Sequence, residues 1–119
     1  MHDIYDVLGR WGAWAALDNS ILGWHTIAAG FKGIVTPPKR SRLQCDDDTG
    51  LLVDEVVLIL KRYNNEGYEL IIAHFVMDIS LRKIAKKLKC SDGTIRKQLS
   101  LAVGFVEGAL ALRSTLTKD

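Results

Sequence analysis

The sequence contains few residues of the kinds that cross-link a chain, interrupt its helices or anchor it in a membrane. Its 119 residues include two cysteines and two prolines, and no apolar run reaches the roughly 18 residues needed to cross a bilayer. Cys45 and Cys90 lie far apart without CxxC spacing, which indicates reduced thiols rather than a disulfide framework. The first residues carry acids and lack the pattern of a signal peptide. These absences predict a cytosolic protein with no membrane association.

Groups of catalytic or metal-binding residues are also lacking. We find neither paired carboxylates nor a Cys/His set that would indicate an enzyme. His25 has no second ligand three or four residues further along the chain. Cys45 is followed by three aspartates, but adjacent aspartates point in different directions, which disfavours a metal site. We therefore predict no catalytic residues, no metal and no other cofactor.

Apolar residues make up 48% of the sequence, which is enough for one modest core. The length fits a single domain. We expect residues 1–119 to form one compact all-α domain. Residues 1–50 would hold the N-terminal helix and loops, and residues 51–113 would hold the helical core.

Apolar spacing predicts most of the helices. They cover residues 3–17, a helical turn at 24–29, residues 49–62 (capped by Asp48 or Thr49) and residues 68–77. In the first helix we assign Trp11 to the core. Trp14 is a candidate for contact with a protein partner, because tryptophan is enriched at interface anchors.

Residues 34–50 form the one clear irregular stretch. Pro37 and Pro38 forbid a continuing helix and favour extended backbone. A basic cluster follows, formed by Lys39, Arg40 and Arg42. It has two interpretations: a solvated loop, or a contact with nucleic acid or with an acidic protein patch.

Residues 79–100 have the pattern of two short helices joined by a tight turn. Ser80 is placed to cap the first helix and Ser91 the second. The predicted buried residues are Leu81, Ile84, Ala85 and Leu88 in the first helix, and Ile95 and Leu99 in the second. This is the layout of a helix-turn-helix, whose second helix enters the major groove by its N-terminal end.

The charge of this segment favours DNA as its ligand. Residues 80–99 contain seven cations and one acid, Asp92, so the segment carries +6. The rest of the chain must carry −4, because the formal net charge is +2. Such a basic face suits phosphate contact. A solvated lysine-rich helix is the alternative, but the two serine caps and the second apolar stripe favour DNA binding.

Several blocks of the sequence resemble known proteins. ISLRKIA at 79–85 and CSDGTI at 90–95 lie within residues 64–102, which resemble region 4 of bacterial sigma factors. The blocks RWGAWA at 10–15, IAAGFKG at 27–33 and QCDDD at 44–48 resemble successive blocks of the lambdoid phage Q antitermination proteins. The branch concerned has a sigma region 4-like helix-turn-helix and no zinc finger.

This resemblance implies a regulator of phage late genes that acts in the bacterial host cytoplasm. Such proteins bind a DNA element at the late promoter and engage RNA polymerase, with its sigma factor, at a promoter-proximal pause. The polymerase then reads through pauses and terminators. The resemblance implies double-stranded DNA and RNA polymerase as partners and leaves open a second copy of the chain on DNA.

Candidate contact residues follow from the pattern. For base edges we expect Asp92, Gly93, Arg96 and Lys97. For phosphates we expect Ser80, Arg82, Lys83, Ser91 and Thr94. For the polymerase we expect Arg10, Trp14, Lys39, Arg40 and Arg42. Two alternatives remain: a phage transcription activator that acts at initiation, and a DNA-packaging adaptor that also carries a helix-turn-helix.

Overall fold

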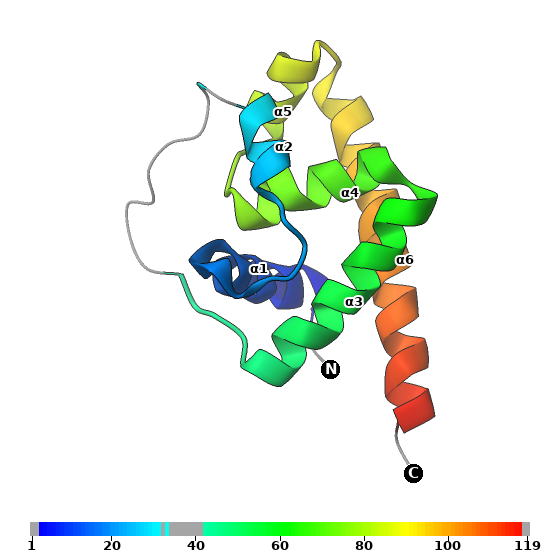
Figure 1. The fold of residues 1–119 in the computed structure, drawn as a ribbon. Helices are drawn as coiled ribbons and strands as arrows, with labels where there is room; N and C mark the ends of the chain where they lie inside the picture. Colours follow the sequence, from blue (N-terminus) through cyan, green and yellow to red (C-terminus); the bar gives the residue numbers. More distant parts are fainter. Residues whose placement is uncertain (1–2, 32, 34–41, 118–119) are drawn as a thin grey trace.

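The structure is a computed structural model that describes residues 3–31, 33 and 42–117 (Figure 1). These residues form α1 (Ile4–Trp14), η1 (Ala15–Asn19), α2 (His25–Gly30), α3 (Asp47–Tyr63), α4 (Asn65–Ile71), η2 (Ile72–Val76), α5 (Leu81–Leu88) and α6 (Asp92–Thr117). η1 and η2 are π-helical turns that continue α1 and α4. No strand occurs in the described part of the chain, and the predicted all-α fold is confirmed. No helix within these residues is long and apolar enough to cross a membrane.

The predicted helices are present, with shifted ends. The helix predicted over residues 3–17 is α1 followed by η1, and the helix predicted over 68–77 is α4 followed by η2. The predicted cap of α3 is wrong. The carboxylate of Asp46, rather than Asp48 or Thr49, is the cap, and it accepts the backbone N–H of Thr49 at 3.1 Å. Asp46 has the extended backbone of an N-cap residue, whereas Asp48 already lies in the first helical turn.

Acid should weaken the start of α3. Hydrogen bonds from the Thr49 hydroxyl and from its backbone N–H lower the pKa of Asp46. Because the folded-state pKa is the lower one, the cap stabilises α3 above the unfolded-state pKa and loses this effect as the pH falls through the folded-state pKa. We expect the protection of the Thr49 amide against hydrogen exchange to fall in acid. Asp46→Asn keeps a capping oxygen that does not titrate, so equal pH profiles for this variant and the wild type would contradict the expectation.

Helices from the N-terminal and C-terminal parts of the described chain contribute to one hydrophobic core. Fully buried side chains come from α1 (Leu8, Trp11), α3 (Val56, Val57), α4 and η2 (Ile71, Ile72), α5 (Ile84) and α6 (Ile95, Val106). The predicted core position of Trp11 is confirmed. Figure 1 shows α5 and the first turns of α6 at one end of the molecule, while the last turns of α6 run toward the other end. The N-terminal helix therefore shares its core with the candidate DNA-binding segment.

A buried carboxylate connects α1 to α3. Asp54 is fully buried. It accepts hydrogen bonds from Trp11 Nε1 at 2.8 Å, Ser20 Oγ at 3.0 Å and the Ile21 backbone N–H at 2.8 Å. A charge buried in an apolar core is unfavourable unless such donors surround it. Asp54 thus fixes α1 and residues 20–21 against the middle of α3.

Trp14 lies in the core and not on the surface. Its side chain is 3% exposed, and its Nε1 donates to Asp47 Oδ1 at 2.9 Å. The indole packs so closely on Gly50 that a Cβ atom there would overlap the ring. The prediction that Trp14 contacts a protein partner is therefore wrong, because α3 already covers the ring.

Candidate nucleic-acid interface

The first helix of the predicted pair, α5, begins at the predicted cap. Ser80 has extended backbone, and its Oγ accepts the backbone N–H of Lys83 at 3.2 Å. Ile84 and Ala85 are fully buried. Leu88 is 50% exposed, so its predicted burial is wrong. Leu88 is the last residue of α5, whereas Cys90 in the following turn is partly buried against the core.

A three-residue turn, residues 89–91, connects α5 to α6. Lys89 adopts the left-handed conformation, with φ 58° and ψ 46°, and its backbone N–H caps the end of α5. Ser91 Oγ accepts the backbone N–H of Thr94 at 3.1 Å and lies 2.9 Å from Thr94 Oγ1. The predicted cap at Ser91 is confirmed, and it leaves the first turn of α6 well ordered.

The second helix, α6, buries the predicted stripe. Ile95 is fully buried and Leu99 is 2% exposed. α6 then continues without a break for 26 residues and packs on α3, α4 and α5. The helix therefore presents its first turns beside α5, while its middle is fixed in the core.

All nine candidate DNA-contact residues are exposed. They are Ser80, Arg82, Lys83, Ser91, Asp92, Gly93, Thr94, Arg96 and Lys97. None of the seven cations between Ser80 and Leu99 forms an ion pair with another residue that the structure describes. The basic charge of α5 and α6 is therefore available to a ligand. The helix-turn-helix layout brings this charge to the end of the molecule where α6 begins (Figure 1).

The sequence profile of the family described as phage antitermination protein Q matches residues 1–117. The chain belongs to the phage antitermination protein Q family. The resemblance to the phage Q antitermination proteins is thereby confirmed.

Curated relatives of this Q-family chain match over most of its length. It is 42% identical over 110 residues to the prophage antitermination protein Q homolog QuuD of Escherichia coli (strain K12), covering 92% of this chain and 87% of the relative. It is 40% identical over 112 residues to antitermination protein Q of Escherichia phage 933W, covering 94% of this chain and 78% of the relative.

Solved structures share the fold of this Q-family chain. One is a selenomethionine derivative of transcription antitermination factor Q21, with a TM-score of 0.68 and 19% identity, covering 97% of this chain and 92% of that chain. The other is the same factor in complex with Q21-binding-element DNA, with a TM-score of 0.67 and 16% identity, covering 95% and 93%. At these identities the likeness establishes the fold.

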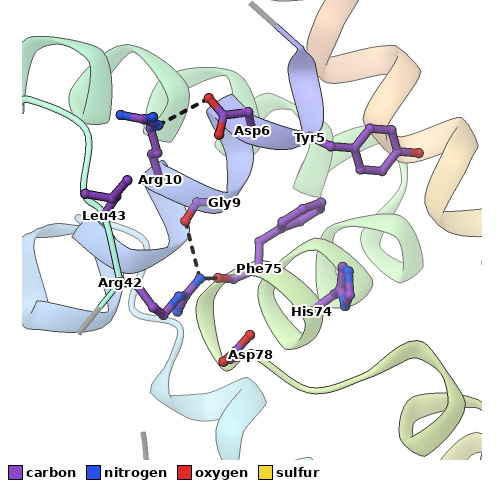
Figure 2. A pocket seen from close by; sticks show the side chains of 9 residues that line it. All are labelled: Tyr5, Asp6, Gly9, Arg10, Arg42, Leu43, His74, Phe75 and Asp78. Atoms are coloured by element: carbon purple, nitrogen blue, oxygen red, sulfur yellow. Dashed lines mark hydrogen bonds and ion pairs between the residues drawn. The ribbon is translucent and has the colours of Figure 1, made fainter. Parts of the chain in front are cut away.

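Arg42 has a structural role within the protein. Its guanidinium donates to the backbone carbonyls of Gly9 in α1 and Phe75 in η2 (Figure 2). It also donates to the carbonyl of Val76, the last residue of η2. The backbone N–H of Cys45 donates to the carbonyl of Arg10 at 3.3 Å and adds a second connection to α1. These bonds hold the segment after residue 41 against α1 and η2, and the half-buried guanidinium still lines the hollow described below, so its contact with a partner stays a prediction.

Two of the candidate polymerase contacts, Arg10 and Arg42, line an open hollow of about 640 Å³. Its lining residues are Tyr5, Asp6, Gly9, Arg10, Arg42, Leu43, His74, Phe75 and Asp78 (Figure 2). Arg10 is exposed and pairs with Asp6 across one helical turn at 3.2 Å. Lys39 and Arg40 lie outside the described residues.

No group of three or more metal-ligating side chains occurs among the described residues. Cys45 and Cys90 are free thiols, both half-buried. Burial raises the pKa of Cys45, and the nearby carboxylates of Asp46 and Asp47 raise it further. The Cys45 thiol is therefore held in its neutral form, in which it is a poor metal ligand and a poor nucleophile.

Proposed function

We propose that this chain is a phage late-gene transcription antiterminator that binds a DNA element at the late promoter and loads onto paused RNA polymerase. It would act in the bacterial host cytoplasm and without a cofactor. The observation that supports this best is the capped α5–turn–α6 unit with its exposed cations, none of which is paired within the described chain. A relative of the same fold has been solved with its DNA element, in line with duplex DNA as the ligand.

The proposed contacts divide between bases and phosphates. As in sigma region 4, the N-terminal end of α6 would enter the major groove. Residues on its exposed first turns would meet base edges: Asp92, Gly93, Arg96 and Lys97. Residues at the starts of α5 and α6 would meet phosphates: Ser80, Arg82, Lys83, Ser91 and Thr94. The hydroxyls of Ser91 and Thr94 are hydrogen-bonded to each other. One of their two hydroxyl protons is used in that bond, so the other is left to donate to a phosphate.

Arg96→Ala and Lys83→Ala should weaken DNA binding in different ways. Arginine can pair with guanine in a bidentate manner, so Arg96→Ala should cost about 1–3 kcal/mol on the specific element and little on a random duplex. Lys83→Ala should weaken binding to both duplexes alike. It should also reduce the slope of log K against log salt by about 0.9, because one counterion-releasing contact is lost.

Fluorescence anisotropy titrations over a range of salt concentrations measure both effects. Arg62→Gln is the matched control, because Arg62 is an exposed cation in the last turn of α3, outside the α5–turn–α6 unit. Equal losses from Arg96→Ala and Lys83→Ala on both duplexes would contradict the division between base and phosphate contacts.

The contact with RNA polymerase is proposed for the N-terminal half. Arg10 is exposed beside the hollow between α1 and η2, and Lys39 and Arg40 follow the two prolines in the sequence. Trp14 would act only indirectly, by fixing α1 in place. Arg42 lines the hollow and also holds the segment after residue 41 against α1. Since α1 supplies part of the core, point variants test this proposal better than deletion of residues 1–50.

In vitro transcription across a terminator tests the whole function. The template carries the chain's own late promoter, and the control template has the candidate DNA element scrambled. Read-through that depends on the element supports antitermination, and its loss in Arg10→Glu with DNA affinity unchanged supports the polymerase surface. More initiation with unchanged read-through would instead indicate an activator. Ring assembly with neither effect would indicate a packaging adaptor.

A further inference from the structure

The turn between α5 and α6 contains an unusual backbone conformation at a charged residue. Lys89 has φ 58°, and among the described residues only Asp78 shares a positive φ without being glycine. In the left-handed region a Cβ atom approaches the following carbonyl oxygen too closely, so glycine normally occupies such a position at a helix end. Gly23 and Gly33 hold the other described positive-φ positions.

Lysine is a poor choice for this backbone position. Aspartate at residue 78 tolerates it better, because a short polar side chain can hydrogen-bond to its own neighbourhood. The Lys89 side chain is exposed and forms no ion pair with a described residue. The left-handed backbone itself caps α5, but the lysine side chain makes no described contact that would offset the strain of a Cβ atom there. A strained residue without such compensation is typical of functional positions.

A stabilising effect on α5 does not explain this lysine. Cations are favoured at a helix C-terminus, but Lys86 and Lys87 already occupy the last turn of α5. The capping bonds at Lys89 come from its backbone N–H, which glycine would provide equally well. Lysine and glycine would cap α5 equally well, so the reason for a lysine at this position must lie in its side chain.

The turn places this cation next to the start of α6. Lys89 is two residues before Ser91, whose Oγ caps α6, and three before Asp92, the first residue of that helix. The bonds from the N–H groups of Lys89 and Cys90 back to the end of α5 hold the turn in one shape. The backbone of Lys89 is therefore fixed, and its side chain extends from a point close to the end of α6 that is proposed to enter the groove.

We infer that Lys89 is a phosphate-binding residue of the DNA interface, positioned by its left-handed backbone beside the groove that α6 occupies. The ligand is a backbone phosphate that flanks the bases read by α6. This inference rests on the proposed function and adds a contact in the turn itself. It predicts that replacing Lys89 with an uncharged residue suited to the left-handed conformation weakens DNA binding without lowering folding stability.

Three substitutions separate the cation from the backbone strain. Lys89→Gly and Lys89→Asn remove the charge and suit the left-handed conformation, so their melting temperatures should equal or exceed that of the wild type. Both variants should lose one phosphate contact, which changes the slope of log K against log salt by about 0.9. Relative to the wild type, their loss of affinity for a random duplex should therefore be about eightfold greater at 0.1 M salt than any difference that remains at 1 M salt. Lys89→Arg keeps the cation and should bind like the wild type.

Two controls make the result decisive. Arg62→Gln removes one exposed cation from the end of α3 and should leave the salt slope unchanged. Asp78→Asn changes the other left-handed position and should not weaken binding. Unchanged slopes in Lys89→Gly and Lys89→Asn, with Lys83→Ala still weakened, would overturn this inference alone. A wild-type chain that binds no duplex would overturn the proposed function instead.

Discussion

Asp54→Ala should be among the most destabilising single substitutions in this protein. It removes the acceptor for three donors: the Trp11 indole, the Ser20 hydroxyl and the Ile21 backbone N–H. The Trp11 bond is buried and the other two are part-buried. A buried donor left without a partner costs about 1–3 kcal/mol and the two part-buried donors add less each, so we expect a loss of about 3–5 kcal/mol. Total stabilities of about 5–15 kcal/mol are usual for small domains. The variant should therefore lie close to its unfolding transition at physiological temperature.

Urea unfolding followed by tryptophan fluorescence measures this loss. Asp48→Ala is the matched control, because Asp48 is exposed in the first turn of the same helix. It should change the free energy of unfolding by less than about 1 kcal/mol. Asp54→Asn keeps an acceptor oxygen but turns an NH₂ group toward existing donors, so its loss should be intermediate. An Asp54→Ala variant as stable as Asp48→Ala would show that the three donors find other partners.

Gly12→Ala should destabilise the protein, whereas Gly9→Ala on the same helix should not. A Cβ atom on Gly12 would overlap the backbone carbonyl of Phe75 and lie 3.1 Å from Arg42 Nη2. Because a backbone group cannot rotate away, we expect a cost near the upper end of the 1–3 kcal/mol range for overpacking, about 3 kcal/mol. The added methyl group would also push α1 away from η2. The hydrogen bonds from Arg42 to Gly9 in α1 and to Phe75 in η2 would then weaken (Figure 2).

The Gly9 variant isolates the steric effect. Nothing lies within 4 Å of a Cβ atom on Gly9, although Gly9 belongs to the same helix. Alanine is favoured over glycine in a helix by up to about 1 kcal/mol, so Gly9→Ala should stabilise the protein. Thermal and urea unfolding of both variants give the comparison. Changes of the same sign and size would mean that α1 does not pack as closely on η2 as described.

The parts of the interface that depend on neighbouring residues could be predicted from the sequence. The caps at Ser80 and Ser91 each involve a backbone N–H three residues further along the chain. Ile95 and Leu99 follow the helical repeat. Such features depend on local hydrogen bonds and periodicity, which the order of residues alone reveals. The cap of α3 was predicted two or three residues too late, because three adjacent aspartates offer the same chemistry.

The parts that depend on distant residues were not predictable in this way. Asp54 meets Trp11 across 43 positions of sequence, and Arg42 meets the carbonyls of Gly9 and Phe75 across 33. Nothing in the local pattern shows that an aspartate in α3 becomes buried, or that a loop arginine points inward. Trp14 illustrates the same limit: its enrichment at interfaces is a general tendency, and the fold assigns it to the core.

The unbroken course of α6 has a geometric consequence. A helix of 26 residues is about 39 Å long, and each residue turns the chain by about 100° around the axis. The two ends of α6 thus keep a constant distance and a constant rotational phase. A duplex bound at the first turns of α6 and any molecule bound at its last turns would therefore be held in a fixed relative orientation. The orientation of the DNA would then determine where the C-terminal end of α6 points.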